Sequence, residues 1–435
     1  MFTSCGYHTF MLSKNLTQNS AMYLLADFKR YRDKTGDIFI KRNDKYKKDT
    51  QGRHFEIINL KKYNGISWIM RFSNTGFVWE DGEIKPCSIK AVINPKILVG
   101  QKSYIEAANV SYLREVEKRF EQEAGKISLI LKGFYNYSLS RVDYCINFDV
   151  SELKFNCPLK WSTKIPELIM YLIRCGDIPA RYKEEYEGDC EFYLKSGVSV
   201  INCYWKYIDL YKNFPECPDL KKSYNIIRFE VQCKYPKVHA ALKEFRKEVR
   251  KQKETQVNEL KKRECFYLPE HLDEGDNEIL QRFFRSCRKD EKIWQRDEIS
   301  VMEMMLSDKE CDSVIETYFN KVIGKGDYYT FDAARRKIEA SVSRWEKVVR
   351  LTRVLEKVST YRGVYKIKNQ LSGKELDDFR RSVRELAELK INPVTIPEEW
   401  GIEYIPNLLG NYRSLCQKEH IGALTDQKDD GIYFI

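Results

Sequence analysis

The chain has 435 residues, of which 43% are hydrophobic and 32% are charged. This apolar fraction is enough to build a sizeable core and excludes disorder along the whole chain. At about 150 residues per domain, the length predicts two or three domains. Lys and Arg number 75 against 64 Asp and Glu, which gives a formal charge of +11. A basic surplus favours an anionic partner, most often nucleic acid, although an ordinary solvated surface explains it as well.

The apolar runs, the N-terminal segment and the cysteines predict the cellular compartment, and the histidines limit the kinds of metal site. No run of about 20 apolar residues occurs, and MFTSCGYHTFMLSKNL at the start lacks the pattern of a signal peptide. The 13 cysteines are odd in number and none lie in a CxxC pair, which favours reduced thiols over a disulfide framework or a zinc site. We therefore expect a cytoplasmic protein without a membrane partner. The five histidines are far apart, so a metal site would need mainly carboxylates.

The first part of the chain reads as mostly β. A helix is predicted near 18–33 and a charged loop at 41–53, followed by a region rich in β-branched and aromatic residues. The predicted strands are FEIINL (55–60), ISWIMRF (66–72), CSIKAVIN (87–94) and ISLILKGFY (127–135). Between the last two, residues 103–123 have apolar positions at helical spacing.

The alternating segment SRVDYCINFDV (140–150) is the clearest strand. Its apolar residues point one way, and Arg141, Asp143, Cys145, Asn147 and Asp149 point the other. A helix is predicted near 164–175. Strands follow at 190–197 and 198–213, joined by a hairpin at Ser196–Gly197, and then at 225–235.

After Pro236 the character of the sequence changes. Residues 237–264 hold ten Lys and Arg against five Glu with a thin apolar stripe, which predicts a long, solvated basic helix. A helical pair is expected at 332–359 and 372–389, with Ser372 and Glu375 as a capping box. The fold class is therefore α+β, an antiparallel sheet with flanking helices followed by a mostly helical C-terminal domain. The predicted divisions are 1–53 for the early elements, 54–265 for the β-rich domain and 266–435 for the helical domain.

Three segments carry residues that suit chemistry, and each also has an ordinary structural explanation. Arg141-Val142-Asp143 could be a strand with one wet face, and Arg228 with Glu230 could form a surface ion pair. The aromatic run from Cys203 to Tyr211 could be an amphipathic strand. Together, however, they bring Asp143, Asp209 and Glu230 to what we expect to be one face of a sheet.

Carboxylates grouped in this way suit Mg²⁺ or Mn²⁺ together with a substrate phosphate. A tyrosine beside such a metal is a plausible nucleophile on phosphorus, and Lys206 could stabilise a bridging or leaving oxygen. This chemistry gives a covalent phosphotyrosine link, so that a strand can be cut and later rejoined.

RVDYCINFD, CYWKYIDL and IRFEVQCK, in this order, resemble the gene II/gene X replication initiators of filamentous phages and related plasmids. PCSIKAVINPKILVGQ (86–101) is similar to a segment that precedes the RxD strand in that family, and the resemblance extends over residues 55–415. It implies a domain that nicks DNA to start rolling-circle replication. By this resemblance Tyr204 is the nucleophile, Lys206 matches the family lysine, and Asp143, Asp209 and Glu230 hold the metal. At position 209 the family often has glutamate, which reaches one methylene further.

The identity of the nucleophile stays open at this point. In a straight strand Tyr204 and Lys206 face one side, whereas Tyr207, Asp209 and Tyr211 face the other. Tyr204 and Asp209 reach one site only if a bulge or strand end intervenes. We therefore rank Tyr204 first, Tyr207 second and Tyr211 third.

The remaining expectations concern partners and alternatives. Arg141 and Arg228 are expected to orient the carboxylates. DNA, as origin duplex and as single strand, would contact the basic helix 237–264 through Lys247, Arg250, Lys251, Lys261 and Lys262, or the helical pair. The resemblance also implies a host helicase and a polymerase as partners, and a homodimer is a further option. The rival functions are a relaxase of a conjugative or mobilisable element with the same chemistry, and a non-catalytic DNA-binding regulator on the same fold.

Overall fold

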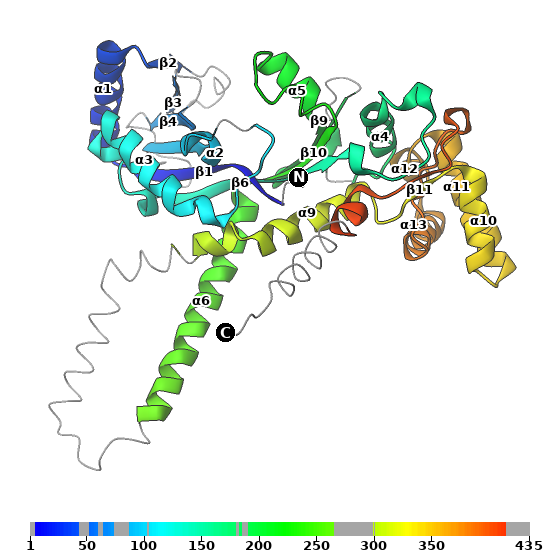
Figure 1. Ribbon diagram of the computed structural model, residues 1–435. Coiled ribbons are helices and arrows are strands. Elements are labelled where there is room, and N and C mark those ends of the chain that lie inside the picture. Colours follow the sequence, from blue (N-terminus) through cyan, green and yellow to red (C-terminus); the bar gives the residue numbers. More distant parts are fainter. Residues whose placement is uncertain are drawn as a thin grey trace, which may run out of the picture.

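A ten-stranded antiparallel sheet forms the centre of the protein (Figure 1). The computed structural model describes residues 5–42, 52–59, 64–73, 87–101, 104–179, 182–184, 190–264, 299 and 301–414. The strand order is β2-β3-β4-β5-β1-β6-β10-β9-β8-β7. The strands are β1 (Gly6–Leu16), β2 (Ile38–Arg42), β3 (Gly52–Asn59), β4 (Ile66–Ser73), β5 (Cys87–Ile93), β6 (Ser138–Asp149), β7 (Lys183–Glu184), β8 (Glu191–Lys195), β9 (Ser199–Trp205) and β10 (Ile226–Cys233).

The first strand of the chain lies in the middle of this sheet. β1 pairs with β5 on one side and with β6 on the other. Its buried residues Phe10 and Leu12 alternate with partly exposed ones, as a strand with one packed face requires. The N-terminal residues therefore build the centre of the sheet rather than an appendage to it.

Helices surround the sheet and form most of the C-terminal region, so the predicted α+β class is confirmed. α9 packs against β1, β6 and β10, whereas α10, α11, α12 and α13 gather at one end of the molecule, and α6 projects away from the body (Figure 1). The helices are α1 (Gln18–Thr35), α2 (Pro95–Leu98), α3 (Leu113–Ile127), α4 (Ile165–Arg174), α5 (Lys206–Asn213), α6 (Tyr235–Glu264), α9 (Asp308–Val322), α10 (Phe331–Ser341), α11 (Trp345–Tyr361), α12 (Val364–Lys368) and α13 (Gly373–Glu388); a two-stranded sheet joins β11 (Tyr328–Tyr329) to β12 (Tyr404–Ile405).

One predicted strand is wrong throughout and another is wrong in part. Residues 127–135 hold the end of α3 at Ile127 and two 3-10 turns, Leu129–Leu131 and Phe134–Asn136, separated by Gly133 at φ 87°. A short apolar run looks the same in a buried turn as in a buried strand, so periodicity could not separate them. The strand predicted at 198–213 ends at Trp205, and α5 begins at Lys206. This strand end decides the geometry of the site described below.

The helical predictions were closer, with three differences. The helix predicted in 103–123 begins only at Leu113. The helix predicted at 332–359 is two helices, because the chain turns extended at Val342 before α11 begins. Ser372 is the N-cap of α13, but its side chain makes no capping hydrogen bond, so half of the predicted capping box is missing. The basic helix is confirmed as α6.

Candidate active site

The pairing of β6, β10 and β9 places polar side chains from three strands on one face of the sheet. Glu230 lies opposite Cys145 and Asn202, and in the next row Arg228 lies opposite Asn147 and Tyr204. Residues directly opposite one another in antiparallel strands point to the same face, and every second residue repeats that direction. Asp143, Glu230 and Tyr204 therefore share one face.

The apolar residues of the same strands point to the opposite face, toward α9. Phe148 and Phe229 both contact the ring of Phe319, with ring centroids 5.6 and 5.3 Å apart. The Tyr144 hydroxyl donates to the backbone carbonyl of Met305, at 2.9 Å. These contacts fix which way the strands face, because a slip of one residue would bring the charged side chains under α9.

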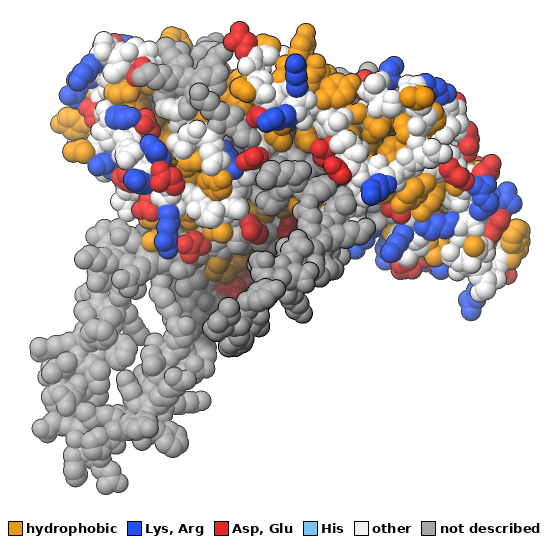
Figure 2. All heavy atoms as spheres, viewed as in Figure 1, with side chains coloured by type: hydrophobic (Ala, Val, Ile, Leu, Met, Phe, Trp, Pro, Cys, Tyr) orange, Lys and Arg blue, Asp and Glu red, His pale blue; other side chains and the backbone are white. Residues whose placement is uncertain are grey.

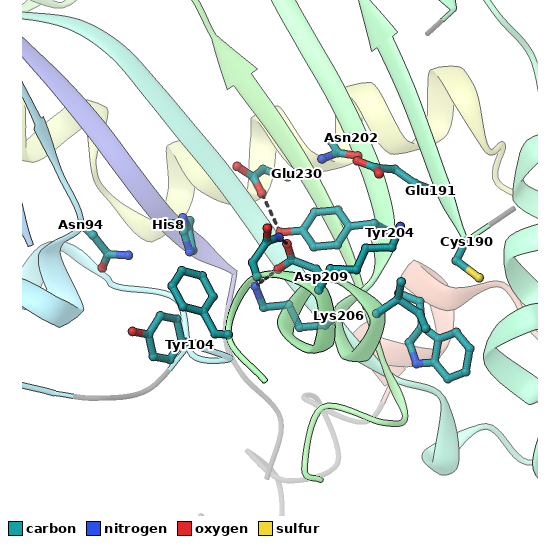
Figure 3. A pocket seen from close by; sticks show the side chains of 15 residues that line it. His8, Asn94, Tyr104, Cys190, Glu191, Asn202, Tyr204, Lys206, Asp209 and Glu230 are labelled. Atoms are coloured by element: carbon teal, nitrogen blue, oxygen red, sulfur yellow. Dashed lines mark hydrogen bonds and ion pairs between the residues drawn. The ribbon is translucent and has the colours of Figure 1, made fainter. Parts of the chain in front are cut away.

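A cavity of about 590 Å³ opens on the polar face (Figure 3). Tyr204 and Glu230 line it from the sheet, while Lys206 and Asp209 line it from α5. The other residues that line it are His8, Asn94, Tyr104, Cys190, Glu191, Asn202, Trp205, Ile208, Lys212, Asn213 and Phe214.

Tyr204 and Glu230 are joined inside this cavity. The Tyr204 hydroxyl donates a hydrogen bond to Oε2 of Glu230, at 3.2 Å. Burial, followed by the neighbouring Glu230 carboxylate, raises the pKa of Tyr204 well above its usual value. Burial and the nearby Asp143 also raise the pKa of Glu230, to about 6. The pair thus holds a protonated phenol against a carboxylate that is ionised at neutral pH and basic for its type.

Lys206 and Asp209 reach the cavity because the strand ends before them. In α5 they lie three residues apart on one face, and Lys206 Nζ contacts Asp209 Oδ2 at 2.6 Å. The ammonium also lies 5.5 Å from the centroid of the Tyr204 ring. Burial and the nearby Arg228 lower the pKa of Lys206. In a straight strand Tyr204 and Asp209 would face opposite sides. Because β9 ends at Trp205 and α5 begins at Lys206, both side chains reach the same cavity.

Arg141 pairs directly with a carboxylate, whereas Arg228 acts on Glu230 through its charge and also contacts Tyr204. Arg141 Nη2 lies 2.9 Å from Asp143 Oδ2, which also accepts a hydrogen bond from Thr9. Arg228 is fully buried and donates to Asn147 Oδ1 at 2.7 Å and to the backbone carbonyl of Ile105 at 2.5 Å. Arg228 therefore ties the loop beside the cavity to the sheet.

The three predicted metal ligands do not all come together. Within the described ranges, no three or more His, Cys, Asp or Glu side chains are grouped as a metal site would need. Asp209 is held by Lys206, but Asp143 and Glu230 lie on neighbouring strands of the same face. The Oδ1 atom of Asp143 is buried without a hydrogen-bond partner among the described atoms, and burial raises the pKa of this carboxyl. Two carboxylates with a spare oxygen fit a cation such as Mg²⁺, which keeps several waters and binds substrate phosphate.

The other two tyrosines lie away from the cavity. Tyr207 and Tyr211 stack on each other with centroids 6.1 Å apart, and Tyr207 also contacts the rings of Trp205 and Tyr224. Neither is among the residues that line the cavity. Of the three tyrosines considered, Tyr204 is thus the one that contacts a carboxylate in the cavity.

His8 is a residue of this cavity that sequence reasoning missed. It lies on β1 where the register with β6 shifts between Tyr7 and Thr9, and its side chain points toward the cavity (Figure 3). Burial and the cations Arg228, Lys206 and Arg141 lower its pKa well below the usual value, so the imidazole is neutral at pH 7. No local pattern marks it, because the other residues that line the cavity, such as Asn94, Lys206 and Glu230, are distant in sequence.

Of the five predicted DNA-binding residues on α6, the structure describes two side chains. Lys247 is exposed and pairs with Glu244 at 3.0 Å, and Lys251 is also exposed. The side chains of Arg250, Lys261 and Lys262 lie outside the described residues. None of the described helices has the length and apolar character needed to cross a membrane.

Comparisons with known proteins find no match for this chain. No family model matches the chain, and no curated protein or solved structure is detectably similar to it.

Proposed function

We propose that this protein is a rolling-circle replication initiator, which nicks and rejoins one DNA strand at an origin through Tyr204. The observation that carries the proposal is the hydrogen bond from the Tyr204 hydroxyl to Glu230, at 3.2 Å, on the wall of a cavity that Lys206 also lines. A nucleophile held against a base, with a cation beside it, is the arrangement that covalent catalysis on a phosphodiester needs. The order of the RVD, YWK and RFE segments in the sequence supports the same reading.

The residues have complementary roles in the proposed reaction. The Tyr204 oxygen attacks the scissile phosphorus while its proton passes to Glu230, which suits a carboxyl with a pKa near 6. The bond from phosphorus to the 3′ oxygen breaks, and Lys206 gives that oxygen a proton. The products are a phosphodiester between Tyr204 and the 5′ end and a free 3′-hydroxyl that can prime synthesis. Attack by a 3′-hydroxyl on the tyrosyl phosphate reverses the steps and rejoins a strand.

Asp143 and Glu230 would hold a divalent cation, Mg²⁺ or Mn²⁺, at this site. The bound cation supplies charge stabilisation at the phosphoryl oxygens. Arg141 and Thr9 keep Asp143 in place through its Oδ2 atom, which leaves Oδ1 for the cation. Asp209, which stands where the resembled family often has glutamate, instead holds Lys206.

The test is a nicking assay on supercoiled DNA that carries the replicon of this gene, with Mg²⁺ or Mn²⁺ and then with EDTA. Tyr204→Phe removes the nucleophile and is expected to abolish nicking and the protein–DNA adduct on the 5′ end. Tyr207→Phe is the matched control, because it makes the same change outside the cavity and should leave nicking unchanged. Loss in Tyr207→Phe alone would overturn the assignment of the nucleophile. Tight binding to the origin without cleavage in the presence of either metal would contradict the proposed nicking activity and favour a DNA-binding regulator. Cleavage only at a transfer origin would favour a relaxase.

A further inference from the structure

A second groove, of about 730 Å³, lies on the same face of the sheet as the Tyr204 cavity. It is lined by strand residues Ser13, Lys90 and Arg141 and, beyond the end of β10, by Lys234 and Tyr235. Ser13 pairs with Lys90 and with Ser138, and Met11 pairs with Arg141, so these side chains point to one face. Since Thr9 and Asp143 are the next pair along, this face is the one that carries Asp143 and Glu230.

All described charged side chains that line this groove are positive. Among its described lining residues are Lys14, Lys90, Arg141 and Lys234, but no Asp or Glu. Partial burial, followed by Arg71 and Arg141, lowers the pKa of Lys90, which means that these cations crowd one another. The Nε atom of Arg141 is buried without a hydrogen-bond partner among the described atoms. A phosphate would relieve both the crowding and the unused donor.

The charges at the helical end of the molecule are arranged differently. There Lys and Arg side chains stand among Asp and Glu side chains (Figure 2), and on α13 Arg380 and Arg381 pair with Asp377 and Asp378. Charges that neutralise each other in this way have little left for a polyanion. In the groove Arg141 pairs with Asp143, but no Asp or Glu is among the described lining residues, so the groove is the better phosphate surface of the two.

We propose that this groove binds the phosphates of a single DNA strand and leads it to Tyr204. The inference rests on the proposed nicking function and deepens it. Pockets of roughly 300–1,000 Å³ hold a ligand of drug-like size, so a groove of this volume takes a short stretch of one strand but not a duplex. Asp143 lies between the groove and the cavity, since it pairs with Arg141 at 2.9 Å and shares the face of Glu230.

The groove also offers a surface on which a base can stack. Tyr235 is 57% exposed and its ring stacks on that of His239, with centroids 5.3 Å apart and an angle of 30° between the ring planes. Ring surfaces of this kind bind bases without regard to sequence, and lysines beside them follow the backbone. From the row of Arg141 to the row of Asn147 and Tyr204 there are six residues of β6, which is about 20 Å at 3.4 Å per residue. The strand would therefore run several nucleotides from the groove to the nucleophile.

The experiment measures the anisotropy of a labelled oligothymidylate of about 15 nucleotides, a length within the site sizes of single-strand binders, in EDTA over a series of salt concentrations. Lys90→Ala should weaken binding by about threefold or more and reduce the slope of log K against log salt by about 0.7, the value for one lost phosphate contact. Tyr235→Ala should weaken binding by about tenfold and leave the slope unchanged, because stacking involves no counterion release. Lys357→Ala and Tyr361→Ala make the same changes at exposed residues of α11 and are the matched controls.

If the groove variants have the same affinities and salt slopes as the two controls, the proposal that the groove binds DNA is wrong. An equal loss of affinity for a duplex of the same sequence would overturn its assignment to a single strand. Nicking by the wild-type protein and by Tyr204→Phe is measured separately. If the wild-type protein nicks DNA while the groove variants bind the oligonucleotide normally, the proposal of a DNA-binding groove is wrong and the proposed nicking function is supported. If the groove variants lose affinity but Tyr204→Phe changes nothing in the nicking assay, the groove stands and the proposed function fails.

Discussion

The two faces of β6 and β10 differ completely although their residues alternate along the same strands. One face buries Tyr144, Phe148 and Phe229 against α9 and Phe319. The other carries Asp143 and Glu230, whose pKa values burial raises, which means that their ionised forms are held at a cost. The apolar face supplies the packing that fixes the register, so the polar face is free to hold groups that destabilise the fold. Three substitutions can break or sharpen this comparison.

The largest effect is expected on the apolar face. Phe229→Ala removes a fully buried ring that contacts Phe319, and it should lower the free energy of unfolding by about 3–5 kcal/mol. Urea denaturation measures this loss. Phe39→Ala on β2 is the control, because Phe39 is 49% exposed. A loss as small as that of the control would mean that α9 does not hold the sheet and that the faces differ less than described.

On the polar face we expect a gain in stability. The raised pKa of Glu230 means that its contribution to stability is present below the unfolded pKa of about 4.5 and is lost as the pH rises through about 6. A shift from 4.5 to about 6 is worth about 2 kcal/mol. Glu230→Gln should therefore be more stable than wild type by about this amount at pH 7.5, with a gap that closes toward pH 4.5, while nicking is lost.

The measurement is urea denaturation of both proteins over that pH range, with the exposed Glu152→Gln as control. Taking the difference between variant and wild type cancels the titration of the carboxyls that do not interact with Glu230, so the remaining pH dependence comes from Glu230 and the nearby Asp143. A gap that is the same at every pH would contradict the raised pKa of Glu230 and with it the description of the polar face.

The sequence predicted this face of the sheet better than it predicted the site. Strict alternation over 140–150 and 225–235 identified both strands and placed Asp143 and Glu230 on their polar sides. The error at Lys206 arose because the segment after Trp205 holds aromatic residues that favour strands, whereas its Lys206–Asp209 ion pair and buried Leu210 stabilise a helix. His8 was beyond local patterns altogether, because only the central position of β1 brings it to the cavity. Tertiary pairing, and not local propensity, assembled these residues.

The smallest effect concerns the helix that covers the apolar face. Ser307 is the N-cap of α9, and its hydroxyl accepts a hydrogen bond from the backbone N–H of Glu310 at 3.3 Å. Ser307→Ala should cost about 1 kcal/mol, the usual value for a lost cap, and lower the melting temperature by a few degrees. Ser372→Ala at the start of α13 makes the same change where the side chain makes no capping bond, so it should cost less than about 0.5 kcal/mol. Equal losses at the two positions would show that Ser372 does form the capping box that its sequence predicts, and that the cap of α9 contributes nothing particular to the apolar face.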